Sequence, residues 1–335
     1  MGNAQVGLDL STAEGLIGFD VASRSWVEAG QAQSGFEKLP ALDGKLVASE
    51  QALNGVAGDF GFVVSRKPSA VLLPGSVEDI ARMIGFARQH RMKICPRGQG
   101  HTLYGQSQVE GGIVIDMRTL ATIHSIQEDR ADVDAGVLWG TLVAQGFSLG
   151  KAPPVLTAFL ELTVSGTLSV GGVSGTSFRY GTQVDNVLEL QVVTGGGERM
   201  SCSPTQNREL FEAVLAGLGQ CGVIVRATLR LIPTPRQVRF YDLGYADAGA
   251  QLRDQQRIAQ ENRFDYMLGF TFPAPGGGWN YRIHALAYDT SPALQDAARL
   301  EGLSYQRGSE QIIDMPYLHW VNRLQPQMQE LLLRG

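Results

Sequence analysis

The sequence predicts an α+β protein with a large first domain, residues 46–235, and the beginning of a second domain, residues 236–335. The length of 335 residues fits two domains or one large one. Short apolar strands and amphipathic helices follow one another up to about residue 235, and the texture of the sequence changes there. With 44% hydrophobic and 18% charged residues, the chain can form a packed core, which argues against global disorder.

Composition argues against several functional classes. A net charge of -5, a pI of about 5.6 and the lack of a basic patch speak against a nucleic-acid partner. The three cysteines, Cys95, Cys202 and Cys221, are too few and too scattered for a disulfide framework or a metal site. No apolar run reaches the ~20 residues of a membrane span, and the first residues lack the pattern of a secretory signal. We therefore expect a cytoplasmic protein with no metal and no membrane partner.

The first domain begins with a regular alternation of elements. Residues 1–45 carry little pattern and are expected to form an N-terminal arm. The following stretch predicts strand, helix, strand, glycine-rich loop and strand, with the strands at 70–73, 93–95 and 111–117. Ser76 is expected to cap the helix between the first two strands.

A second block completes the first domain. Residues 132–150 predict a strand end followed by a helix. Residues 161–186 are rich in Gly, Ser and Thr without a helical period, which predicts a second ligand-binding loop. Residues 187–202 predict a hairpin around a triple glycine, and residues 207–219 predict an amphipathic helix ahead of a strand at 223–233.

The last hundred residues predict a separate α+β domain. Residues 239–272 read as strand, helix and strand, and residues 279–289 read as another strand. No closing element is recognisable before Gly335, so this domain is expected to be incomplete or to be completed by a second chain.

The motif GLGQCG, residues 217–222, matches G-x-G-x-x-G letter for letter. In a dinucleotide-binding unit these glycines follow a strand and open a helix. Here a predicted helix comes before the glycines and a predicted strand comes after them. We therefore expect no nicotinamide site at this position.

The stretch PRGQGHTLYGQ, residues 96–106, is the strongest functional signal. It places Gly98, Gly100 and Gly105 around His101. Glycine clusters mark tight turns or places where the backbone approaches a ligand closely. From these residues alone, a turn with a solvated histidine and a ligand-binding loop are both open.

Together with GGIVIDM, this stretch resembles the flavin-binding segment of the vanillyl-alcohol-oxidase-like, PCMH-type FAD-linked oxidoreductases, and within them the cytokinin dehydrogenases. Two further stretches, LELTVSGTLSVGGVSGTSFRYGTQVDNVLELQVVTGGGE and LFEAVLAGLGQCGVIVRATLRLIP, are similar to the same enzymes. The resemblance covers residues 60–235 and extends more weakly through FDYMLGF and MPYLHWVNRL. It implies a PCMH-type FAD-binding domain of two subdomains, followed by an α+β substrate domain.

The resemblance implies that His101 is bonded covalently to the 8α-methyl group of the flavin. A neutral histidine is an able nucleophile, and a pKa near ~6.5 keeps it neutral at pH 7. The second loop has no cysteine for another link, so a single attachment is implied. The resemblance also places a set of residues along the pyrophosphate and the flavin: Gly98, Gln99, Gly100, Thr102, Gln106, Ser107, Thr163, Ser169, Val173 and Ile224. For Val173 and Ile224, plain core packing is the open alternative.

The chain departs from the cytokinin dehydrogenases just before the second loop. Their Trp-Thr-Asp-Tyr-Leu motif is matched by Leu-Thr-Ala-Phe-Leu, so Ala158 stands where an aspartate takes the substrate proton. Hydride transfer still requires a group that removes a proton or charge from the substrate. Glu161 is one candidate for a substitute base, with an ordinary polar residue beside the loop as the alternative. Asp265, Tyr266 and His284 are further candidates that the sequence does not rank.

The sequence therefore predicts an FAD-dependent oxidoreductase, an oxidase or dehydrogenase of specialised metabolism. It would transfer hydride from a C–N or C–OH centre of a small molecule to a flavin held by His101, and dioxygen or another acceptor would reoxidise the flavin. An oxidative decarboxylase, a subunit of a split enzyme and a non-enzymatic flavin-binding remnant are the alternatives. Whether a second chain or a homo-oligomer completes the protein stays open.

Overall fold

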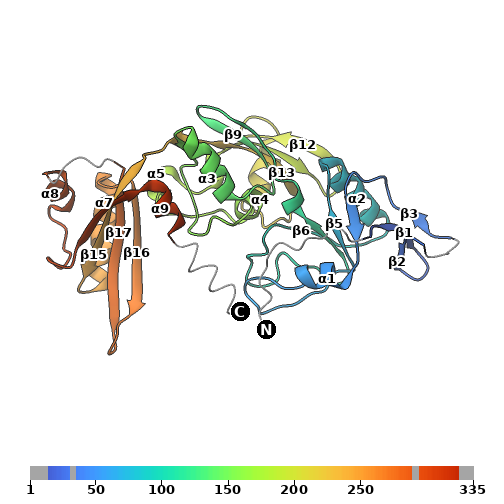
Figure 1. Ribbon diagram of the computed structural model, residues 1–335, viewed down its shortest axis with the longest axis horizontal. Helices are drawn as coiled ribbons and strands as arrows, with labels where there is room; N and C mark the ends of the chain where they lie inside the picture. Colours follow the sequence, from blue (N-terminus) through green and yellow to red (C-terminus); the bar gives the residue numbers. More distant parts are fainter. Residues whose placement is uncertain (1–13, 31–34, 289–293, 324–335) are drawn as a thin grey trace.

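The structure is a computed structural model that describes residues 14–30, 35–288 and 294–323. Its strands form three larger sheets and two small ones. The molecule is elongated, with the small N-terminal sheet at one end and the sheet built from residues after 236 at the other (Figure 1). The mixture of helices and strands confirms the predicted α+β class.

The first sheet has the strand order β4-β5-β7-β6. Strands β5, β7 and β6 run parallel, and β4 is antiparallel to β5. Helix α2 (Val77–Gln89) connects β5 to β6, and the Ser76 hydroxyl caps it by accepting a hydrogen bond from the Asp79 N–H at 3.2 Å. These elements follow the predicted order. The strand bounds are β4 Lys45–Val47, β5 Ala70–Leu73, β6 Ile94–Arg97 and β7 Ile113–Asp116.

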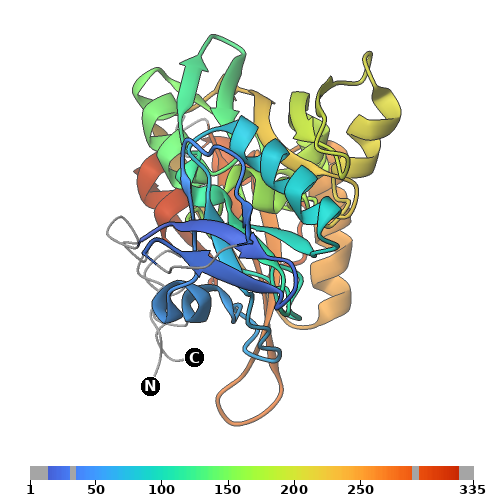
Figure 2. The ribbon, with the colours of Figure 1, turned by 90° about the vertical axis from the view of Figure 1, so that its right-hand side faces the viewer.

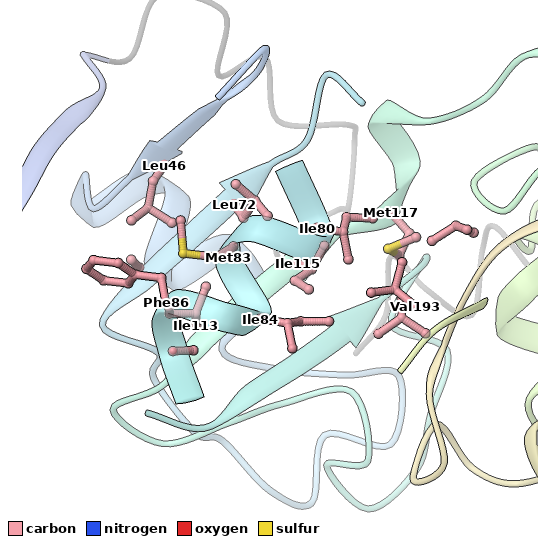
Figure 3. Close-up of a cluster of buried hydrophobic side chains, with 14 of the residues drawn as sticks. Leu46, Leu72, Ile80, Met83, Ile84, Phe86, Ile113, Ile115, Met117 and Val193 are labelled. Atoms are coloured by element: carbon pink, nitrogen blue, oxygen red, sulfur yellow. The ribbon is translucent and has the colours of Figure 1, made fainter. Parts of the chain in front are cut away.

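The apolar face of α2 builds the core of this subdomain. Ile80, Met83 and Ile84 point towards side chains from β4, β5 and β7 (Figure 3). Val193, from the second sheet, belongs to the same buried cluster. The first two sheets therefore share one core, and the loop that leaves β6 starts from a closely packed layer.

The N-terminal segment differs from the predicted arm. Its described part forms an antiparallel sheet with the order β2-β1-β3. Leu16 and Phe19 are buried in the same cluster as α2, and the Phe19 ring packs on Trp26 with 4.9 Å between centroids. The burial is shared among strands of only a few residues, so no clear period is visible in the sequence. The bounds are β1 Leu16–Asp20, β2 Ser25–Glu28 and β3 Glu37–Lys38.

The second sheet has the order β12-β11-β13-β9-β8, and all its neighbouring strands are antiparallel. The predicted hairpin is β11 with β12, and helix α3 (Trp139–Ser148) packs on the core of this sheet. Helix α6 (Arg208–Val214) precedes β13, so GLGQCG lies in a helix-to-strand connection, as predicted. The bounds are β8 Ile123–Ile126, β9 Arg130–Asp134, β11 Val187–Val193, β12 Arg199–Cys202 and β13 Val223–Arg230.

The stretch 161–186 is more regular than its composition predicts. It contains two short helices, α4 (Val164–Leu168) and α5 (Ser177–Tyr180). Thr163 begins α4, and its hydroxyl accepts a hydrogen bond from the Gly166 N–H at 3.3 Å. Helices of four or five residues make little more than one turn, so they leave no 3.6-residue period in the sequence.

The third sheet is antiparallel with the order β16-β17-β15-β18, and helix α7 (Ala248–Glu261) packs against it. The succession of strand, helix, strand and strand is the predicted one. The hairpin that joins β16 to β17 projects beyond the rest of the fold (Figure 2). Helix α9 (Tyr317–Asn322) follows β18 directly. The bounds are β15 Gln237–Tyr245, β16 Tyr266–Pro273, β17 Trp279–Ala287 and β18 Gln311–Pro316.

The third sheet is tied to the stretch 161–186. The Met267 N–H donates to the Gly175 carbonyl at 2.8 Å, and Arg179 forms an ion pair with Asp265. No helix in the described part of the chain is long and apolar enough to cross a membrane. Within the same residues, no group of three or more His, Cys, Asp and Glu side chains is placed to hold a metal ion.

Candidate functional site

The glycine-rich loop leaves the end of β6 and is paired with the segment after helix α1 (Glu50–Val56). The Phe60 N–H donates to the Gly100 carbonyl at 2.9 Å, and the Gly61 N–H donates to the Thr102 carbonyl at 3.0 Å. The approach is so close that a Cβ on Gly61 would lie 1.9 Å from the Leu103 oxygen. The segment 59–61 and the glycine loop 100–105, about forty residues apart in sequence, are thus joined by hydrogen bonds, and we call this pair of segments the Asp59 clamp.

Asp59 is the polar centre of this clamp. Only 2% of its surface is exposed. Its Oδ2 accepts hydrogen bonds from the Thr102 hydroxyl and from the Gly105 N–H, both at 2.7 Å, and its Oδ1 accepts one from the Gly61 N–H at 3.2 Å. The Thr102 hydroxyl also lies 2.9 Å from the Ser107 hydroxyl. Asp59 therefore fixes the path of the loop, and our sequence analysis missed it. The sequence feature that could have indicated Asp59 is a single acidic residue between two glycines, in GDFG at residues 58–61.

Arg97 lies beneath the loop and was also missed. Its exposed fraction is 3%, and its Nη1 donates to the Ser107 hydroxyl at 3.1 Å. Burial, together with the neighbouring Arg118, lowers the pKa of Arg97 to about 10, while Asp116 and Asp59 oppose this shift. The guanidinium stays charged at neutral pH. A Cβ on Gly100, whose φ is +67°, would lie 2.1 Å from its Nη2, so the backbone rests directly on this cation.

The imidazole of His101 is held between two phenylalanine rings. The Phe60 ring stacks on it with 4.1 Å between centroids and 22° between planes, and the Phe159 ring lies at 5.3 Å on a tilt. Burial lowers the pKa of His101 below its ordinary value, so the ring is neutral at pH 7. This packing argues against a turn with a solvated histidine, one of the two alternatives that the sequence left open.

The second loop meets the first at Thr163, which is 1% exposed. A Cβ on Gly98 would lie 2.1 Å from the Thr163 hydroxyl oxygen, so glycine is required where the loops cross. Directly after α4, the Ser169 hydroxyl donates to the Ser165 carbonyl at 2.8 Å. Residues from two predicted loops are thus brought together by the fold.

Only some of the predicted cofactor-binding residues lie where the two loops meet. Gly98 adjoins Thr163, and Gly100, Thr102 and Ser107 adjoin the segment around Asp59 or one another. Gln99 and His101 lie between these residues in the loop. Gln106 is exposed, and its Oε1 accepts a hydrogen bond from the Tyr104 N–H at 2.9 Å. Val173 is 70% exposed, so it is no core residue. Ile224 is 3% exposed and packs in the core of the second sheet, as its alternative interpretation proposed.

A cavity of about 120 Å³ lies next to the second loop. Its walls come from residues 153–154, 156–158, 160, 173–176, 266, 268 and 288, and from helix α9 with Arg323. Most of the wall is apolar or aromatic. The Phe159 ring packs on His101, and the two chain neighbours of Phe159, Ala158 and Leu160, line the cavity, so a single residue links the glycine loop to the cavity wall.

The candidate proton acceptors that the sequence suggested do not all lie at the cavity. Ala158 and Tyr266 line the cavity, whereas Glu161 is absent from its described walls. The Glu161 Oε1 instead lies 3.1 Å from the point that a Cβ on Gly140 would occupy, in the first turn of α3. Asp265 pairs with Arg179 and accepts a hydrogen bond from the Tyr288 N–H at 2.7 Å. His284 faces Asp242 in the third sheet at 3.4 Å.

The chain is similar to flavoproteins over most of its length. Residues 68–203 match the family model described as an FAD binding domain. An uncharacterized oxidoreductase, ORF5 in the fasciation locus of Rhodococcoides fascians, is 40% identical over 284 residues, which cover 84% of this chain and 65% of that protein. Cytokinin dehydrogenase 4 of Oryza sativa subsp. japonica is 44% identical over 226 residues, 64% of this chain and 43% of that protein.

Among solved structures, 6-hydroxy-D-nicotine oxidase from Arthrobacter nicotinovorans has the same fold. The TM-score is 0.68 at 24% sequence identity, with 84% of this chain and 64% of that chain covered. This chain thus spans less than two thirds of the length of the curated relatives named above.

The residues present fit a dinucleotide flavin. Gly100 and Gly105 on one loop, and Gly171 and Gly172 on the other, have positive φ angles, a conformation found where successive backbone N–H groups bind an anion. Arg97 adds a buried positive charge beneath the first loop. The side-chain oxygen of Gln183, beside Gly172, is buried and has no hydrogen-bond partner among the described residues, so it offers an acceptor to a bound group.

The matching family model, the similar oxidoreductases and the shared fold all point to an FAD-binding domain, and the two glycine-containing loops fit that function. The chain carries a PCMH-type FAD-binding domain and is similar to FAD-linked oxidoreductases, among them the cytokinin dehydrogenases.

Proposed function

We propose that this protein transfers hydride from a C–N or C–OH centre of a small molecule to an FAD that is bonded covalently to His101, and that dioxygen or another acceptor reoxidises the flavin. The position of His101 carries this proposal. Its neutral imidazole lies on the glycine loop and packs on Phe60 and on Phe159, and the chain neighbours of Phe159, Ala158 and Leu160, line the cavity.

The side chains around His101 favour attachment. A histidine attacks only through a nitrogen that carries no proton, and burial keeps His101 in the neutral form at pH 7. The two phenylalanine rings restrict rotation of the imidazole, which holds one orientation ready. When bound, the flavin supplies the electron-accepting ring that this set of side chains lacks.

The cavity is the site that we assign to the substrate. Burial raises the pKa of Tyr266, with Arg323 acting in the opposite direction, so its hydroxyl is protonated at neutral pH. The hydroxyl can therefore hold a substrate heteroatom by a hydrogen bond, but it is a poor proton acceptor. The methyl group of Ala158 accepts no proton. The substrate proton must leave by another route, which sets this site apart from the one that the resemblance implies.

Ala158 also favours two other candidate functions. With no acid at this position, the protein would be an oxidative decarboxylase or a flavin-binding remnant, and a subunit of a split enzyme is a separate alternative. Turnover of amines and alcohols by the purified chain would support the first proposal over the remnant. Co-purification of a second polypeptide would support a split enzyme.

The test of attachment is acid precipitation of the purified protein, followed by measurement of flavin fluorescence in the pellet. We expect wild-type protein and the control His124→Ala to keep the flavin in the pellet, because His124 pairs with Asp134 on the second sheet, away from the loop. His101→Ala should release it to the supernatant. Release from wild-type protein would refute the covalent bond.

A further inference from the structure

The cavity has an unusual distribution of charge. Among the described side chains in its walls, Arg323 alone is charged, and the acidic and basic residues nearby in sequence are engaged elsewhere. Asp265, for example, pairs with Arg179 and is not among the residues that line the cavity. A single cation therefore sets the electrostatic character of the space.

Arg323 is held in a fixed position by helix α9. Its guanidinium carbon lies 3.2 Å from the centre of the Trp320 ring, and its Nη1 donates to the Trp320 carbonyl at 2.8 Å. Its Nη2 approaches the Tyr266 hydroxyl at 3.4 Å, which is a long hydrogen bond. Within residues 14–30, 35–288 and 294–323, no carboxylate forms an ion pair with it.

This geometry favours a planar anion as the ligand. A guanidinium that stacks on an aromatic face keeps its N–H groups in the plane of its edge, where they match the two oxygens of a carboxylate. These two hydrogen bonds use only part of the five N–H donors of Arg323. A partly enclosed charge that has no anionic partner among the described residues is costly unless a ligand supplies one.

The remaining walls specify the rest of the ligand. Tyr266, Tyr288, Tyr317 and Leu268 present aromatic and apolar surface to the space. Its volume of about 120 Å³ is close to that of cavities that hold one benzene ring. The cavity therefore fits one flat ring with an acidic substituent, better than a long or cationic molecule.

We propose that the cavity binds a small planar substrate that carries a carboxylate, with the carboxylate paired to Arg323 and the ring among the tyrosines. The proposal rests on the proposed function in one respect, the assignment of the cavity as the substrate site. It also explains why an acidic side chain at position 158 is dispensable here, since a carboxylate in the wall would repel such a substrate.

Three molecules of nearly equal size test the proposal: benzoate, benzamide and benzylamine, which carry a negative charge, no charge and a positive charge. Their binding to the purified full chain is measured by calorimetry, with no turnover required. We expect benzoate to bind at least about 10-fold more tightly than benzamide, and benzylamine to bind most weakly. Arg323→Gln should weaken benzoate binding by about 10-fold to 100-fold and leave benzamide unchanged.

A matched control is Arg307→Gln, because Arg307 also stacks on an aromatic ring, that of Tyr305 at 4.6 Å, but lies outside the cavity walls. It should leave all three affinities unchanged. If Arg323→Gln does not fold, Arg323→Lys and the order of the three wild-type affinities decide. Equal binding of benzoate and benzylamine, no benzoate binding, or benzoate binding unaffected at position 323 would each overturn the proposal. The flavin assignment is tested separately by the acid pellet, so the two can fail independently.

Discussion

Phe159 links the glycine loop to the wall of the cavity, yet the loop and the cavity are built in opposite ways. The loop is held by polar contacts, and Asp59 alone accepts three hydrogen bonds within it and its partner segment. The cavity is mostly apolar and aromatic, and the Tyr266 hydroxyl receives one long hydrogen bond from Arg323. The loop is thus pre-organised, whereas the cavity wall is shaped by packing.

This difference has a functional consequence. A loop whose polar groups are already paired loses little conformational freedom when a ligand binds, which suits a cofactor that every turnover uses. A wall made of side chains from distant segments can change without disturbing the fold, which suits a substrate site that evolves. We therefore expect substitutions in the loop to affect stability strongly, and substitutions in the cavity to affect ligand choice.

The largest effect is expected for Asp59→Ala. The substitution removes three hydrogen bonds, from the Thr102 hydroxyl, the Gly105 N–H and the Gly61 N–H, and it removes a negative charge near Arg97. We expect the free energy of unfolding in urea to fall by about 3 kcal/mol or more. Asp59→Asn keeps an acceptor oxygen and should lie in between. Asp129→Ala, on the surface beside Arg130, is the control and should show no measurable change.

The next effect is expected for Gly98→Ala, which forces the two loops apart. Its Cβ would lie 2.1 Å from the hydroxyl oxygen of the buried Thr163. We expect a loss of about 1–3 kcal/mol in thermal or urea unfolding, together with a lower content of bound flavin. At Gly58 a Cβ meets nothing within 4 Å, so Gly58→Ala should keep stability and flavin content. Equal behaviour of the two variants would contradict the crossing of the loops.

Two hydroxyl deletions compare the regions directly. Thr102→Val removes a hydroxyl with two short contacts, to Asp59 and Ser107, and should cost about 1–2 kcal/mol. Tyr266→Phe removes a hydroxyl with one contact at 3.4 Å and should change stability by less than about 0.5 kcal/mol. Both values come from urea unfolding of the purified variants. A larger loss for Tyr266→Phe would show that the cavity wall is as rigidly specified as the loop.

The smallest effect concerns pH. Burial lowers the pKa of His101, so the unfolded chain takes up a proton at a higher pH than the folded one. The contribution of His101 to stability is therefore full above its ordinary pKa of ~6.5 and is lost as the pH falls through the folded value. Measured on flavin-free protein from about pH 7 to about pH 5, stability should decline less in His101→Gln than in wild type.

Phe60→Leu keeps the imidazole but removes its stacked neighbour, so its pH dependence should lie between these two. An identical decline in all three proteins would assign the pH dependence to other groups.

Local patterns in the sequence predicted much of the fold. The helix after Ser76, the hairpin at 187–202 and the strand-helix-strand order after residue 236 all carry a cap, a turn or a period that residues close in sequence create. The N-terminal sheet and the short helices within 161–186 carried none, because strands and helices of a few residues leave no period to detect. Tertiary packing decides their structure.

The sequence by itself determined the α+β class, the glycine loop around His101 and the alanine at position 158. Each of these depends on residue type or on spacing over a few positions. Only the tertiary structure decided that Asp59 and Arg97 lie beneath that loop, that Ile224 is buried and Val173 is exposed, and that Ala158 and Arg323 share one cavity. Burial and contacts between distant segments arise from packing of the whole chain, and no local pattern encodes them.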